Sequence, residues 1–190
     1  MPQTHNLTTK EKVKALLGIT ANTDDTLLDT LCDAITAYIE GEAGGQRFKL
    51  TEHENEIHDG DNGQWLRLRH RYIYSTPEIK VEYQNGSNSS PDWKEMSADD
   101  YDTYPENGTI YLHQKIAGKR NLRITYTAGF SATPYDLELT ASMIVARVYN
   151  QRKSQGIANE SYEGVSISWK DAITEMEQAV INRYTRRSFI

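Results

Sequence analysis

The sequence predicts an α+β fold, in which a helical bundle of about four helices carries an inserted antiparallel β module. Apolar residues recur with helical spacing near both ends of the chain, whereas in the middle they alternate with polar residues. Asn-Gly and Asp-Gly dipeptides, which favour tight turns, separate the alternating runs. We therefore expect a single domain over residues 1–190, with residues 1–45 and 131–190 as the helical core and residues 46–130 as the β-rich module.

Two helices are predicted before the β module. Thr8 and Glu11 have the spacing of a capping box, and Gly18 ends the first helix. The second helix runs from Asp24 to Glu42 and carries two adjoining apolar stripes, which predicts contact on two sides. The stripes are Leu28, Cys32, Ile35 and Ile39, and Leu27, Leu31, Ala34 and Tyr38.

The middle of the chain predicts several short strands. Alternation is clearest over residues 65–69, 79–83, 109–112 and 122–126. Residues 85–107 are polar and acidic, so we expect a long exposed excursion that could touch a partner. Residues 59–63 resemble part of a calcium loop but lack its downstream glutamate, so a tight hairpin turn is the preferred interpretation.

Two further helices are predicted after the β module. The third starts at Thr133 and Pro134, ends at Tyr149 to Arg152, and has an apolar face of Leu137, Ala141, Ile144, Val145 and Val148. Residues 165–168 predict a short strand or an extended arm. Ser168 and Asp171 then predict the cap of a fourth helix, whose apolar stripe would be Trp169, Ile173, Met176, Val180 and Tyr184.

Composition narrows the classes of function. The chain has 27 acidic and 21 basic residues and a net charge of -6, which argues against a dedicated duplex-DNA binder. The single cysteine, Cys32, excludes an intrachain disulfide and is expected to fill the core. We found no apolar run long enough for a membrane span and no signal segment, which favours synthesis in a reducing cytoplasm.

A metal-dependent hydrolase built around His53 and His58 is a further hypothesis. A zinc-protease helix needs two histidines four residues apart, but these lie five apart in a segment that predicts a strand. Residues five apart on a regular strand face opposite ways. Exposed polar strand residues are therefore the preferred interpretation, and no metal or other cofactor is expected.

A nucleic-acid-binding module is the alternative function. Trp65, Arg67, Arg69 and Arg71 would share one strand face, and a basic row beside an aromatic ring is typical of single-stranded nucleic-acid platforms. Because the chain is acidic, cross-strand or intersubunit ion pairs are the preferred interpretation of these arginines.

The C-terminus predicts a partner site. It ends in apolar residues beside arginines, so we expect a partner to order it. The residues proposed are Arg183, Arg186, Arg187, Phe189 and Ile190. No serine-elbow motif, phosphate-binding glycine loop or cysteine–histidine pair occurs, so the sequence does not predict an enzyme.

The order of these segments, over nearly the whole chain, resembles the tailed-phage head–tail connector (adaptor) family. The run from Ile124 to Phe130 reads ITYTAGF, and Pro134-Tyr135-Asp136-Leu137 follows it to open a long helix. The segment from Glu160 to Val165 is acidic and contains a glycine, and it precedes a closing amphipathic helix. The β module is the part that departs from the family pattern.

The resemblance implies a structural virion protein at the head–tail neck, made in the host bacterial cytoplasm. It implies a homo-oligomeric ring, commonly twelvefold, between the portal protein and the tail or tail-completion protein. DNA would pass through the ring without being specifically bound, as the negative charge of the chain allows. The second and third helices would form the seams between subunits, with Leu27, Leu31, Tyr38, Arg147 and Arg152 as the proposed subunit interface.

Overall fold

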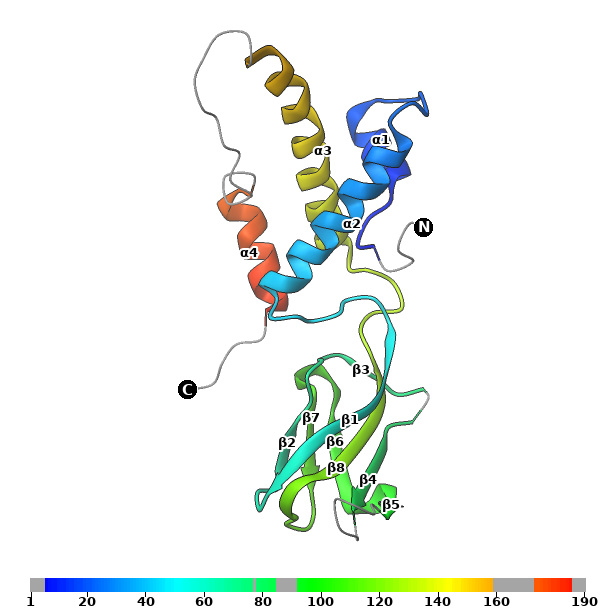
Figure 1. The fold of residues 1–190 in the computed structure, drawn as a ribbon, viewed down its shortest axis with the longest axis vertical. Coiled ribbons are helices and arrows are strands. Elements are labelled where there is room, and N and C mark those ends of the chain that lie inside the picture. Colours follow the sequence, from blue (N-terminus) through cyan, green and yellow to red (C-terminus); the bar gives the residue numbers. More distant parts are fainter. Residues whose placement is uncertain (1–5, 77, 85–91, 159–172, 186–190) are drawn as a thin grey trace. The chain divides into compact units, whose positions relative to one another are not determined.

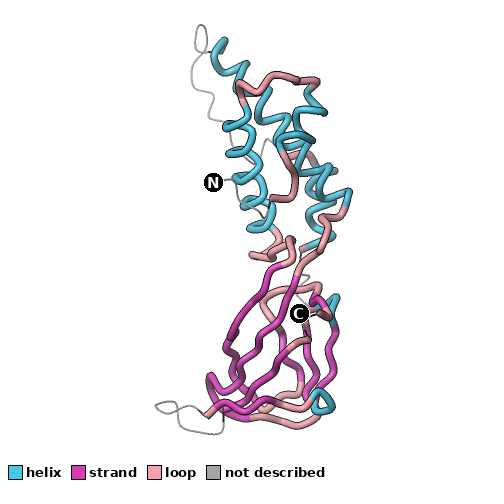
Figure 2. The backbone as a smooth tube through the Cα atoms, turned by 90° about the vertical axis from the view of Figure 1, so that its right-hand side faces the viewer, coloured by secondary structure: helices cyan, strands magenta, loops and turns pink. Residues whose placement is uncertain are grey.

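The computed structural model describes residues 6–76, 78–84, 92–158 and 173–185. The chain divides into two compact units (Figures 1 and 2). A helical unit comprises Met1–Gln46 and Thr133–Ile190, and a β unit comprises Arg47–Ala132. Helices and antiparallel sheets occur together, which confirms the predicted α+β class.

The described part of the helical unit contains four helices: α1 (Lys10–Leu17), α2 (Asp25–Glu42), α3 (Tyr135–Ala158) and α4 (Glu175–Tyr184). The long helix α3 contacts each of the other three. Their apolar faces form one core, because burial of such side chains is the main stabilising term. Its fully buried members include Val13, Leu28, Ile35, Ile39, Leu137, Ala141, Ile144, Val145, Tyr149 and Ile181.

The start of α1 differs from the prediction. Thr9, not Thr8, is the residue before the helix. Thr8 is buried, and its hydroxyl lies 2.6 Å from that of Ser142 in α3. The helix ends at Gly18, as predicted, in the left-handed region with φ of 67°.

The third helix is longer than predicted, since α3 continues through Gly156 to Ala158. The fourth begins later than predicted. Thr174 accepts a hydrogen bond from the backbone N–H of Glu177, whose own side chain caps Thr174 in return. The predicted strand at residues 165–168 and the predicted cap at Ser168 and Asp171 lie outside the described residues.

The later start changes which face of α4 is buried. Met176, predicted to lie on the apolar stripe, has 81% of its surface exposed. Glu177 and Ile181 are the buried residues of this helix instead. The predicted stripe is wrong at Met176, because the neighbouring Glu177 is the residue that binds Arg147 of α3.

The β unit contains two sheets. In the larger sheet the strand order is β1-β8-β4-β5, and β3 also pairs with β8; in the smaller sheet it is β2-β7-β6. All these pairs are antiparallel. The strands are β1 (Thr51–Asp61), β2 (Trp65–Arg67), β3 (Ile73–Tyr74), β4 (Lys80–Gln84), β5 (Trp93–Glu95), β6 (Tyr101–Tyr104), β7 (Thr109–Leu112) and β8 (Ala117–Ala128).

Both sheets contribute to one buried cluster. Along β7 and residues 121–126 of β8 its members alternate with half-buried residues, as is typical of strands. The members of the cluster are Leu66, Leu68, Ile73, Val81, Met96, Tyr101, Ile110, Leu112, Leu122, Ile124, Tyr126 and Ala128.

Two predictions for the β module were wrong. Within residues 85–107, the described part forms β5 and β6 and buries Met96 and Tyr101, so it is not an exposed excursion. Residues 59–63 do not form a hairpin, because β1 pairs with β8 whereas β2 pairs with β7. The turn passes from one sheet to the other, and Gly63 N–H donates to the Asp61 carboxylate at 2.8 Å.

Candidate functional site

The two stripes of α2 differ in burial. Leu28, Cys32, Ile35 and Ile39 are buried within the helical unit. Burial raises the pKa of the Cys32 thiol to about 12, so this thiol is unreactive core filling, as predicted. The second stripe remains partly open: Leu27, Leu31 and Tyr38 are half-buried and Ala34 is exposed. We call these four residues the outer stripe of α2.

Arg147 and Arg152, the other residues proposed for subunit contact, lie on α3. The Arg147 guanidinium donates two hydrogen bonds to the carboxylate of Glu177 in α4, at 2.8 and 2.7 Å. Burial alone would raise the pKa of Glu177, but hydrogen bonds from Arg147 and Thr174 outweigh it and lower that pKa. The side chain of Arg152 lies outside the described residues. Their role between subunits stays a prediction.

The end of α4 is tied to the first turn of α3. Tyr184 donates its hydroxyl to Asp136 at 2.6 Å, and the Arg183 guanidinium lies 3.2 Å from the same carboxylate. The remaining residues of the predicted partner site lie outside the described residues: Arg186, Arg187, Phe189 and Ile190. The partner site stays a prediction.

A polar cluster in the β unit was not predicted. The carboxylate of Glu56 in β1 accepts hydrogen bonds from the Tyr126 hydroxyl at 2.7 Å and from Arg69 N–H at 2.9 Å. It also lies 2.6 Å from Nε2 of His58. Burial alone would raise the pKa of Glu56, but these hydrogen bonds outweigh it and lower that pKa to about 2.

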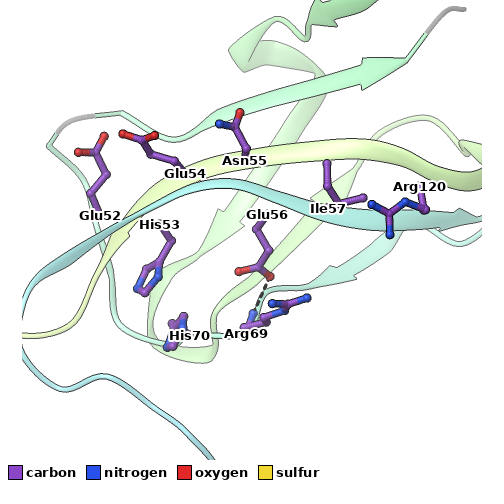
Figure 3. A pocket seen from close by; sticks show the side chains of 9 residues that line it. All are labelled: Glu52, His53, Glu54, Asn55, Glu56, Ile57, Arg69, His70 and Arg120. Atoms are coloured by element: carbon purple, nitrogen blue, oxygen red, sulfur yellow. Dashed lines mark hydrogen bonds between the residues drawn. The ribbon is translucent and has the colours of Figure 1, made fainter. Parts of the chain in front are cut away.

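Two histidine rings lie beside this carboxylate (Figure 3). His53 stacks on His70 with ring centroids 3.9 Å apart and 12° between the planes. Nε2 of His53 is buried and has no hydrogen-bond partner among the described residues. Burial lowers the pKa of His53, although the nearby Glu56 opposes this. His53 is therefore held as a neutral ring.

The predicted exposure and orientation of the two β1 histidines were wrong. The pairing of β1 with β8 shifts between His53 and Glu56, and Asn55 has a φ of 55°, which marks a β-bulge. The extra residue turns His53 to the same side of β1 as Glu56 (Figure 3), and His58 contacts that carboxylate as well. Both histidines are half-buried.

The geometry of this cluster fits a structural role. A general base must accept a proton near neutral pH, and a carboxyl with a pKa of about 2 does so poorly. Both oxygens of Glu56 are already engaged by the protein. A cavity of about 500 Å³ adjoins Glu56, and Glu52, Glu54 and Arg120 also line it. Across the described ranges, no three histidine, cysteine or acidic side chains are grouped to hold a metal ion.

The basic row proposed for nucleic acid does not continue along one strand. Strand β2 ends at Arg67, so Arg69 and Arg71 lie beyond it. Arg71 donates to the backbone carbonyl of Glu106 at 3.1 Å. Trp65 is 59% exposed, and its ring packs at a tilt against the rings of Tyr104 and Tyr111.

Sequence reasoning missed the Glu56 cluster for a physical reason. Arg69 and Tyr126 are far from Glu56 along the chain and meet it only when the strands assemble. A buried glutamate cannot be recognised from the alternating pattern of β1, which is mostly polar.

In the part of the chain that the structure describes, no helix has the length and hydropathy of a membrane span.

The described residues thus combine a partly open apolar helix face with a buried carboxylate that is engaged inside the chain, as in a structural protein that assembles with other chains. The chain belongs to the head completion protein family, whose model matches residues 6–187. This confirms the predicted resemblance and the predicted function, a structural head–tail connector of the virion. No curated protein sequence matches the chain.

Solved structures share the fold. A chain described as the neck of an empty GTA particle computed with C6 symmetry is 17% identical, with a TM-score of 0.65, covering 95% of this chain and 89% of that one. A chain from the virion of a native gene transfer agent (GTA) particle is 15% identical, with a TM-score of 0.62 and the same coverage. One from the neck of a native GTA particle computed with C12 symmetry is 17% identical, with a TM-score of 0.58, covering 87% and 85%.

Proposed function

We propose that the chain forms a homo-oligomeric ring beneath the portal protein, where it links the capsid to the tail and lets DNA pass. The similar chains from GTA necks were computed with C6 and C12 symmetry, which supports a ring of about twelve copies. The family of structural virion proteins to which the chain belongs supports the absence of enzymatic activity. Synthesis would take place in the host cytoplasm before assembly.

The outer stripe of α2 is the observation that carries this proposal. Leu27, Leu31 and Tyr38 keep part of their apolar surface open although the helix has a complete inner face. A closed ring needs contacts between different patches of identical subunits. The outer stripe supplies one such patch, and the C-terminal residues after Thr185 supply the contact to the neighbouring portal or tail-completion ring.

The test is a charge placed within the outer stripe. Leu31→Glu should prevent assembly, because burying an unpaired carboxylate in an apolar contact is strongly unfavourable. Incorporation into particles should fall by about tenfold or more. Ala37→Glu is the matched control, since Ala37 is exposed on the same helix and outside the stripe. Equal incorporation of the two variants would refute the role of the stripe.

The ring should not retain DNA. The net charge of -6 opposes phosphate binding, and the basic row of the β unit ends at Arg67. In a filter assay at ~50 mM salt, where phosphate contacts are strongest, we expect no retention of single- or double-stranded DNA. Retention that is lost in an Arg67→Ala, Arg69→Ala, Arg71→Ala variant would favour the nucleic-acid-binding alternative.

A further inference from the structure

Helix α3 contacts each of the other three helices of its unit. From α1, Lys12 forms an ion pair with Glu138. From α4, Glu177 binds Arg147. Helix α2 packs on the buried face, which comprises Leu137, Ala141, Ile144 and Val145.

Within the residues that the structure describes, one side of α3 is exposed and carries apolar side chains. Tyr135 has 76% of its surface exposed and Met143 has 45%, while Leu139 and Ala146 are half-buried. Their spacing places the four residues on one stripe of the helix. The open face of α3, as we call these four residues, therefore has the composition of an interface.

We propose that the open face of α3 in one copy packs against the outer stripe of α2 in the next copy. This inference rests on the proposed ring and supplies the second patch that ring closure requires. Both stripes contain four uncharged residues and extend about 17 Å along their helices, so their lengths match. Tyrosine and methionine are enriched at the centres of protein interfaces, and Tyr135 and Met143 would be the anchors.

The proposal names a contact between two different surfaces, so it can be tested by directed cross-linking in purified particles. Leu31→Cys and Leu139→Cys together should give a ladder of covalent oligomers on a non-reducing gel. Each substitution alone should give only monomer, because like surfaces do not meet in this arrangement. The native Cys32 does not interfere, since its thiol is buried.

The outcomes separate this contact from the ring itself. A monomer band from the double variant, a ladder from either single variant, or a cross-link to a different particle protein would overturn the proposed contact. The number of copies per particle, measured by quantitative mass spectrometry, tests the ring independently. About twelve copies without a ladder would retain the ring and reject the contact, whereas one or two copies would reject both.

A matched pair of methionines provides a second readout. Met143→Lys should reduce incorporation into particles by about tenfold or more, because it places a charge in the contact. Met176→Lys changes a more exposed methionine on α4, outside both stripes, and should leave incorporation unchanged. Equal incorporation of the two variants would overturn the proposal. Thermal unfolding of both purified variants controls for folding.

Discussion

Arg147 and Glu177 join α3 to α4 through two parallel hydrogen bonds of 2.8 and 2.7 Å. The same carboxylate accepts from the backbone N–H and the hydroxyl of Thr174, so one buried side chain both caps α4 and docks it. Paired hydrogen bonds between a guanidinium and a carboxylate are among the strongest polar contacts in proteins. The position of α4 therefore depends on this pair as much as on Ile181.

Removing the carboxylate should destabilise the helical unit. Glu177→Ala removes two hydrogen bonds of the partly buried Arg147 guanidinium and deletes the cap, so we expect the free energy of unfolding to fall by about 2–3 kcal/mol. Glu175→Ala is the control, since Glu175 is exposed two residues earlier on the same helix. Urea unfolding followed by far-UV circular dichroism measures both; similar losses in the two variants would contradict this role of Glu177.

The β unit should lose stability in acid because of Glu56. Its pKa is about 2 when folded and near 4.5 otherwise. Because the folded value is the lower one, the stabilisation is complete above the unfolded pKa and is lost as pH falls toward 2. The difference corresponds to roughly 3 kcal/mol. Urea unfolding at pH 5 and pH 3 should show a smaller loss of stability in Glu56→Gln than in wild type and in the exposed control Glu54→Gln.

His53 should make the stability of the β unit depend on pH above the range in which Glu56 titrates as well. Burial lowers its pKa below 6.5, so the stability that neutral His53 supplies is present above that pH and is lost as pH falls through the folded pKa. His53→Phe keeps a ring against His70 but cannot titrate. Between pH 7 and pH 5 the free energy of unfolding should change less in this variant than in wild type. Equal changes in the two proteins would show that His53 does not contribute to the pH dependence.

Gly129 should resist substitution. It has a φ of 109°, and a Cβ there would lie 2.5 Å from the carbonyl oxygen of Lys49. Gly129→Ala should therefore lower the free energy of unfolding by about 2 kcal/mol or more. Gly41 lies within α2 with open space around it, so Gly41→Ala should raise stability by about 0.5–1 kcal/mol. Calorimetry of both variants tests the contrast; a neutral Gly129→Ala would show that the backbone can relax there.

Removing residues 186–190 should abolish attachment to the neighbouring ring without unfolding the chain. The cut lies after Tyr184, whose hydroxyl bonds to Asp136, so the docking of α4 is kept. A larger deletion from Arg183 would remove that contact as well and would not separate folding from attachment. Complementation with the truncated gene measures the effect. Infectious particles at wild-type yield would show that the C-terminal partner site was assigned wrongly.

Local signals predicted the bounds of α2 but misplaced the start of α1, the end of α3 and the start of α4. The ends of α2 follow from Asp24 and the glycines after Glu42, which act within one turn. The bulge at Asn55 could not be predicted, because it depends on how β1 pairs with β8.

The open face of α3 was likewise invisible in the sequence. Tyr135, Leu139 and Met143 follow the same helical period as the buried residues, and only the packed neighbours distinguish the two faces. Seams between copies can be recognised once the contacts within one copy are known.

Cryo-electron microscopy of the neck in purified particles tests the central claim most directly. We predict a closed ring of about twelve copies between portal and tail, with the outer stripe of α2 covered by a neighbouring copy. A reconstruction in which this chain is missing from the neck, or in which Leu27, Leu31 and Tyr38 face solvent in every copy, would contradict the account.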